Sequence, residues 1–301
     1  MSESKIQTIE KPSTKRKREI CQRCIRPTPS TCICAALPSQ PLVLFKSRVL
    51  VLQHPTECKR KNRSLPLIEL SLNNQSTRND GKEEDADADA NFDFTFHTIV
   101  ARWWGEQVAE PAIWKLVNNP DEPVLLCFPS DDAISVQEAM ERISVERSQR
   151  LQDQESESCN GSNNEETSQS QSQSQSQPQP LSDKDFKVNI IFLDATWKYA
   201  KEMDTKTIQN GGWPKHTIRV KLDPSKDCKD SFQPRRFDIR APPTENHLST
   251  AECIAHVLRI VEGDDSVFDI LMRPLDLMVQ QWHSFAEDKK KLKIDNNKGG
   301  T

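Results

Sequence analysis

Short apolar segments that alternate with helical patterns restrict the fold of this chain more than any other feature. The most apolar of them, residues 188–193, reads VNIIFL and has a single polar position. A strand that is apolar at nearly every position is buried on both faces, which is typical of parallel sheets covered by helices. The sequence therefore predicts an α/β fold with a mostly parallel sheet. The expected strands are 48–53, 98–103, 123–128, 188–193 and 217–222.

Helical spacing of apolar residues fills the stretches between these strands. Ser135 and Glu138 are spaced like a capping box at the start of a helical pattern over 134–143. A short helix is expected to follow the strand 188–193 and to end near Met203. Residues 249–261 and 266–282 read as two further helices. The elements thus alternate in the order that α/β proteins require.

The charge is unevenly distributed along the chain. The whole sequence has 41 basic and 45 acidic side chains, a net charge of −4. Two polar stretches, 81–90 (net −4) and 151–185 (net −6), have too few apolar residues to form a core and are predicted to be disordered insertions. The other 256 residues carry a net charge of +6. The folded part is therefore expected to be basic, which is compatible with a nucleic-acid partner.

Targeting signals leave several possibilities open. No run approaches the roughly 18 apolar residues of a membrane span, and residues 1–20 form a polar, basic tail that is expected to be disordered and lacks the apolar segment of a secretory signal. The basic run at 15–18 fits either a nuclear import signal or an RNA-binding arm. We expect a cytoplasmic or nuclear protein, or both, with a second basic tail at 284–301. No membrane association and no protein partner are indicated.

Four cysteines within fourteen residues indicate a metal site. Thiolates at such short spacing can close a tetrahedral zinc site, and a site closed by four protein ligands is structural because it has no open position. The alternative is four incidental cysteines in a flexible arm. We expect a small zinc-binding module over residues 21–40. Its ligands would be Cys21, Cys24, Cys32 and Cys34.

Asp194, Thr196 and Trp197 follow the most apolar strand directly. Ligands of open α/β sheets gather where strands end at their carboxyl edge, so these three residues are candidates for catalysis. Asp194 is equally consistent with a helix N-cap, and Trp197 with packing inside the next helix.

Two further groups of residues are candidates for binding. Ser249 and Glu252 form a capping box around Thr250, and a helix start of this kind can also hold a carboxylate. His54 follows the expected strand 48–53, and a basic cluster comes next, on the same rim of the sheet. A solvated surface explains that cluster equally well. The cluster consists of Lys59, Arg60, Lys61 and Arg63.

These pieces in this order resemble the DTW-domain family, whose members look like tRNA-uridine aminocarboxypropyltransferases. The resemblance rests on the cysteine array with Arg26-Pro27 inside it, the segment Gln53-His54-Pro55-Thr56-Glu57, the signature Asp194-Ala195-Thr196-Trp197, and Leu248-Ser249-Thr250-Ala251-Glu252. It covers roughly residues 21–283, and the catalytic domain would occupy 41–283. Ala195 stands where many members carry glycine, a mild departure that leaves the chemistry untouched.

The resemblance implies an activity, a donor and a fold. Members transfer the 3-amino-3-carboxypropyl group of S-adenosylmethionine to N3 of a uridine in a tRNA loop and release methylthioadenosine, on a SPOUT-like fold with a trefoil knot. By that resemblance Asp194 would be the general base or would hold the donor's ammonium, with Thr196 and Trp197 beside it. Ser249, Thr250, Glu252 and His54 would bind the donor. The basic cluster would be the main contact of the tRNA phosphates. Further candidates for such contacts are Arg23, Arg26, Arg235, Arg236 and Arg240.

Two other functions remain open from the sequence. A non-catalytic RNA-binding zinc adaptor would share the charge pattern and the cysteines, but it has no need of an acid at the ligand edge of the sheet. A SPOUT-type RNA methyltransferase would use the same donor and add a much lighter group.

Overall fold

Six parallel strands form a single sheet in the part of the chain that the structure, a computed structural model, describes: residues 18–60, 62–73, 93–159, 187–223, 227, 236–239 and 247–298. The strand order is β2-β1-β5-β3-β6-β4, and every neighbouring pair is parallel. The predicted α/β class with a parallel sheet is therefore confirmed. The strands are β1 (Ser47–Gln53), β2 (Phe96–Val100), β3 (Val124–Cys127), β4 (Ile134–Ser135), β5 (Val188–Asp194) and β6 (Thr217–Lys221).

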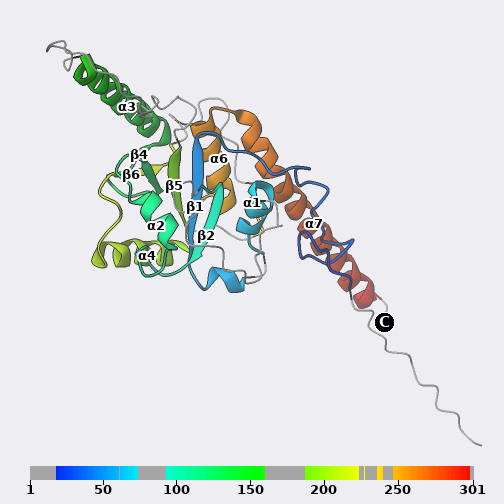
Figure 1. Cartoon of the computed structure of the whole chain (residues 1–301). Coiled ribbons are helices and arrows are strands. Elements are labelled where there is room, and N and C mark those ends of the chain that lie inside the picture. Colours follow the sequence, from blue (N-terminus) through cyan, green and yellow to red (C-terminus); the bar gives the residue numbers. More distant parts are fainter. Residues whose placement is uncertain are drawn as a thin grey trace, which may run out of the picture.

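Helices cover both faces of the sheet (Figure 1). The last one, α7, begins beside α6 and extends well beyond the sheet. A single 3-10 turn, η1 (Glu57–Lys59), follows β1. The α-helices are α1 (Leu65–Leu72), α2 (Pro111–Val117), α3 (Val136–Cys159), α4 (Trp197–Gln209), α6 (Thr250–Glu262) and α7 (Asp265–Lys298).

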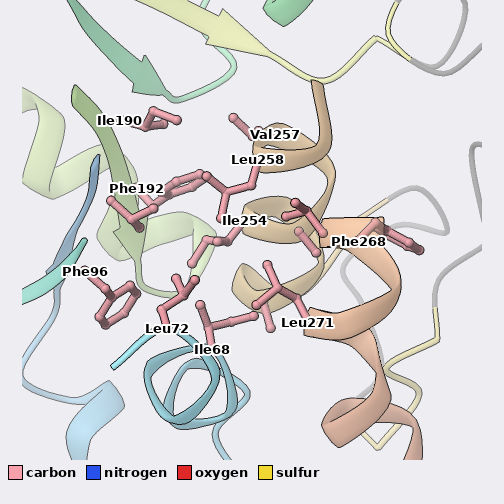
Figure 2. Close-up of a cluster of buried hydrophobic side chains, with 14 of the residues drawn as sticks. Ile68, Leu72, Phe96, Ile190, Phe192, Ile254, Val257, Leu258, Phe268 and Leu271 are labelled. Atoms are coloured by element: carbon pink, nitrogen blue, oxygen red, sulfur yellow. The ribbon is translucent and has the colours of Figure 1, made fainter. Parts of the chain in front are cut away.

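Alternate residues of the central strands enter two separate cores because successive side chains of a strand point to opposite faces. Ile190 and Phe192 of β5 pack against α1, α6 and α7 in the first core, and Figure 2 shows them facing Ile254 and Leu258. Ile191, between them, belongs to the second core, with α2 and α4. Burial on both faces explains why β5 is apolar at almost every position.

Two expected elements begin at other residues than predicted. The helix expected from residue 134 begins instead at Val136, because residues 134–135 form β4, which pairs with the end of β6. The backbone N–H of Glu138 still donates to Ser135 Oγ over 3.1 Å, so half of the predicted capping box is present. The strand expected at 98–103 is β2, which begins at Phe96 and ends at Val100. The chain turns after Val100, and Trp104 enters the second core with none of its surface exposed.

Helices α3 and α7 are longer than the sequence indicates. The helix α3 continues to Cys159 and so includes the start of the segment 151–185, for which disorder is expected. Helix α7 continues past Trp282 to Lys298 and includes most of the expected tail 284–301. The extension of α3 is rich in Gln and Glu and that of α7 is rich in Lys, and all three are good helix formers, so polarity did not prevent a helix. The insertion 81–90, the rest of 151–185 and residues 1–17 lie outside the described residues.

Candidate active site and metal-binding cluster

The carboxyl ends of β1 and β5 form a topological switch point. These strands are neighbours over their whole length, with Gln53 opposite Asp194 as their last residues. After β1 the chain enters α1, which packs in the first core, whereas after β5 it enters α4, which packs in the second core. In open α/β sheets the crevice between two such strand ends is where ligands bind. The predicted signature around Asp194 lies at these two strand ends, the expected place of a ligand crevice.

Asp194 joins three elements through its carboxylate. Gln53 Nε2, from β1, donates to Oδ2 over 2.6 Å. Thr250 Oγ1, from the first turn of α6, donates to Oδ1 over 2.7 Å. Gln53 and Asp194 are 3% and 9% exposed, so both are shielded from solvent. The carboxylate is therefore held at a fixed place at the end of β5.

The polar residues at the start of α6 have two roles: Ser249 and Glu252 cap the helix, and Thr250 contacts Asp194. Ser249 and Glu252 form the predicted capping box, and Glu252 also accepts hydrogen bonds from the backbone N–H groups of Arg236 and Phe237. Glu252 is 2% exposed, and its carboxylate is shared between the helix cap and the backbone of residues 236–237. Its proposed contact with a donor molecule stays a prediction. Thr250, by contrast, contacts the carboxylate of Asp194 directly.

Trp197 lies in an aromatic cluster at the start of α4. Its ring stacks against Phe128, with centroids 5.7 Å apart, and meets the ring of His247 edge-on at 5.7 Å. Lys201 Nζ lies 5.3 Å from the centroid of the same ring, within the range of a cation–π contact. Thr196 is the N-cap of α4, but its side chain makes no capping hydrogen bond. Both residues are half-buried and lie within three residues of Asp194.

His54 is a buried neutral imidazole at the end of β1. It is 2% exposed and stacks on Tyr199 of α4, with centroids 4.3 Å apart. Burial, and then the positive charge of Arg102, lowers the pKa of His54. The backbone N–H of Thr56 points at His54 Nδ1 over 3.3 Å, and since an N–H can only donate, Nδ1 accepts and Nε2 carries the proton.

The predicted basic cluster lies directly after this strand end. Lys59 and Arg60 are exposed, Arg63 is half-buried, and Arg60 Nε is 3.2 Å from Glu57 Oε1. Lys61 lies outside the described residues. Arg102, which the sequence did not single out, is exposed after β2 and acts electrostatically on His54. The rim beside the crevice therefore carries exposed positive charge.

Three of the other arginines named from the sequence make contacts within the chain. Arg23 donates to the carbonyl of Pro38 over 2.8 Å, and Arg26 lies 3.1 Å from Met278 Sδ. Arg236 forms an ion pair with Asp276 at 2.7 Å. Arg235 and Arg240 lie outside the described residues. These contacts indicate structural roles for Arg23 and Arg26.

The four N-terminal cysteines form one cluster. Their sulfur atoms all lie within 4.8 Å of one another, with 3.5 Å between Cys21 and Cys34 and 3.7 Å between Cys24 and Cys32. Zinc bound tetrahedrally at about 2.3 Å from each sulfur would place the sulfurs about 3.8 Å apart. The backbone N–H of Cys24, followed by the thiol of Cys34, lowers the pKa of Cys21 to about 6. The spacing and the amide donors aimed at sulfur both fit a structural zinc ion.

The cysteine cluster is attached to α7 and to the first core. Gln281 of α7 donates to the carbonyl of Cys32 over 3.0 Å, and Cys24 and Ile33 are buried in the first core. Figure 1 shows this N-terminal segment, in dark blue, running along α7. A metal bound here would therefore stabilise the packing of α7 on this segment.

Comparison with known proteins shows the family of this chain. A model of the DTW domain matches residues 18–283, so the chain belongs to the DTW domain family. The tRNA-uridine aminocarboxypropyltransferase 2 of Macaca fascicularis is 22% identical over 263 residues, which cover 87% of this chain and 63% of that protein. The tRNA-uridine aminocarboxypropyltransferase A of Arabidopsis thaliana is 25% identical over 255 residues, which cover 82% of this chain and 74% of that protein.

This chain spans less than two thirds of the length of the mammalian relatives; the mouse protein of the same name, 23% identical, is also covered over 63%. No solved structure matches the chain. Among the described residues, none of the helices combines the length and the apolar character needed to cross a membrane.

Proposed function

We propose that this protein transfers the 3-amino-3-carboxypropyl group of S-adenosylmethionine to N3 of a uridine in a tRNA. The observation that carries the proposal is the carboxylate of Asp194, held by Gln53 and Thr250 at the switch point of a DTW-family sheet. Relatives in primates, rodents and plants bear the name of this activity. The SPOUT-like knot that the resemblance implies is part of the same proposal.

In the proposed reaction one bond forms and one breaks at the same carbon. N3 of the uridine attacks Cγ of the amino-acid arm, the Cγ–sulfur bond breaks, and its electron pair neutralises the sulfonium to give methylthioadenosine. The proton of N3 leaves to a base. Attack on Cγ in place of the methyl carbon is a matter of orientation, which a rigid crevice provides.

Asp194 would serve this reaction in one of two ways. As a general base it would take the N3 proton, and as an anion it would hold the ammonium of the donor's amino-acid arm. A carboxylate has about four lone-pair sites, and Gln53 and Thr250 occupy two of them. The remaining sites suffice for either role. Thr196, Trp197, His54 and the Ser249–Thr250 helix start would line the places of the two substrates.

We expect the basic rim to contribute to tRNA binding through phosphate contacts. Replacing Lys59, Arg60 and Arg63 together by alanine should weaken tRNA binding at least about 10-fold, because each lysine or arginine on a phosphate releases counterions. The slope of log affinity against log salt should fall by about 0.7 to 0.9 for each phosphate interaction that the substitutions remove. Filter binding at several salt concentrations measures both quantities.

A control variant with three alanine substitutions removes the same number of positive charges at another place in the fold. Arg142, Arg147 and Arg150 lie on α3, whose far end projects from the body in Figure 1. Alanine at these three positions should leave the slope unchanged. An equal effect of both triples would show that only the net charge matters and would remove the rim from the proposed interface.

Labelled donor and unmodified tRNA test the function directly. Incorporation of label from the amino-acid arm into tRNA, with methylthioadenosine as the second product, supports the proposal. Incorporation of the methyl label alone would identify a methyltransferase, and mass analysis of the modified nucleoside separates the two products. Binding of tRNA without any incorporation would favour a non-catalytic adaptor.

A further inference from the structure

We propose that Gln53 is the positioning residue for Asp194 and that the thiol of Cys58 fixes the orientation of the Gln53 amide. The contact itself follows from the geometry, and its catalytic meaning rests on the function proposed above. Neither side chain belongs to the signature that sequence patterns single out as catalytic.

Three hydrogen bonds in series carry the inference. Cys58 Sγ donates to Gln53 Oε1 over 2.8 Å, Gln53 Nε2 donates to Asp194 Oδ2 over 2.6 Å, and Thr250 Oγ1 donates to Asp194 Oδ1 over 2.7 Å. An ionised carboxylate only accepts, so the amide must present its nitrogen to Asp194 and its oxygen to the thiol. Rotation of the amide by 180° would place oxygen against oxygen at one end.

The backbone fixes both ends of this series. Gln53 and Asp194 are register partners at the ends of two adjacent strands, and the carbonyl of Gln53 accepts from the N–H of Ala101 over 3.1 Å. Cys58 is the middle residue of η1, the single turn that brings the chain back over the end of β1. Gln53 is 3% exposed, so water cannot easily replace either of its contacts.

The consequence is a carboxylate that cannot turn. Bonds to both oxygens restrict rotation of the Asp194 side chain, and the lone pairs left over keep one direction relative to the strand ends. Catalysis and tight binding both depend on such positioning, and partners that hold a catalytic group are worth about 10-fold to 100-fold in well-studied sites. Without Gln53, Asp194 would keep one fixed contact.

Gln53→Glu tests the contact without any enzyme assay. The variant has nearly the same shape but faces one carboxyl group with another, and two carboxylates this close cannot both be ionised. The pair then keeps a proton in the folded state up to a pH above the usual range of Glu. The shared proton contributes to the stability of the folded variant in full below about pH 4.3, the pKa of Glu in the unfolded chain. This contribution is lost as the pH rises through the raised pKa of the pair in the folded state. We expect the deficit in Tm against the wild type to widen between pH 5 and pH 8.

The same variant and three others test the role in transfer. If Asp194 is the general base, Gln53→Glu should move the acid limb of the pH profile of kcat to higher pH. If Asp194 holds the ammonium of the donor, the acid limb of kcat/KM for the donor should move instead. Gln53→Ala should lower the rate about 10-fold to 100-fold. Cys58→Ala should lower it less, and Cys58→Ser, which keeps a donor, should restore it.

The outcomes separate the inference from the function. A constant Tm deficit together with unmoved pH limbs, in variants that fold, would overturn the positioning role. Equal rates for Cys58→Ala and Cys58→Ser would remove Cys58 from it. The wild-type chain could transfer nothing while the Tm deficit of Gln53→Glu still widens with pH. That result would support the contact between Gln53 and Asp194 but refute the proposed function and the catalytic part of this inference.

Discussion

Asp194→Ala abolishes transfer, with an expected loss of at least about 10³-fold in kcat/KM. General acid–base groups contribute about 10²-fold to 10⁴-fold, and Asp194 is also the acceptor on which Gln53 and Thr250 converge. The affinity for tRNA should stay within about threefold of the wild type, because phosphate contacts elsewhere supply most of that affinity. Steady-state transfer of labelled donor and filter binding of tRNA measure the two quantities on one preparation.

Stability must be checked in the same experiment. Removing the carboxylate leaves the buried amide of Gln53 without its acceptor, which costs about 1–3 kcal/mol. Thr250→Val is a matched control, since it removes one hydrogen bond of Asp194 and keeps the carboxylate. We expect Thr250→Val to lower kcat/KM by about 10-fold to 100-fold, as Gln53→Ala does, and therefore clearly less than Asp194→Ala. A folded Asp194→Ala protein with wild-type kcat/KM would refute both roles proposed for this residue.

Removal of the metal is expected to have the second large effect, on stability. A ligand that binds only the folded chain stabilises it by about 4 kcal/mol when present at 1,000 times its Kd. One kcal/mol corresponds to about 2–4 °C in Tm for a domain of 150–250 residues. A strong chelator should therefore lower Tm by roughly 8–16 °C, because the cysteine cluster packs on α7 and the first core. Differential scanning calorimetry with and without chelator measures the shift.

Metal analysis supplies the control for this prediction. The wild type should bind one zinc ion per chain, Cys24→Ser should bind none, and Cys58→Ser, outside the cluster, should bind one. Binding replaces thiol protons, so the apparent affinity should fall as the pH is lowered. Full zinc occupancy in Cys24→Ser, or an unchanged Tm after complete removal of zinc, would contradict a structural four-cysteine site.

The sequence predicted the sheet because its strands are buried on both faces. Residues 188–193 are apolar at almost every position, and in the structure their side chains are buried alternately in the two cores. The four cysteines were predictable for a similar reason, since thiols rarely cluster without a metal. The strand order was not predictable, because contacts between β1 and β5 join residues that are more than 130 positions apart.

Parts of the candidate site needed the tertiary structure. Gln53 is polar at the end of a strand, as Asp194 is, and it begins one of the segments that carry the family resemblance, but neither signal gave it a role. Only the register places the two side chains together, and only η1 brings Cys58 back to Gln53. The length of α3 was missed because a stretch rich in Gln and Glu suits both a helix and a disordered segment.

The neighbouring residues Ser249 and Thr250 fix the N-terminus of α6 beside the carboxylate of Asp194. The helix is capped at Ser249, buried along its length in the first core (Figure 2), and tied to the carboxylate at Thr250. An axial shift of α6 would have to break that tie or the core packing. The crevice is therefore preorganised: binding of the donor should need little backbone rearrangement at this edge, and less conformational entropy is lost on binding than in a site that must first assemble.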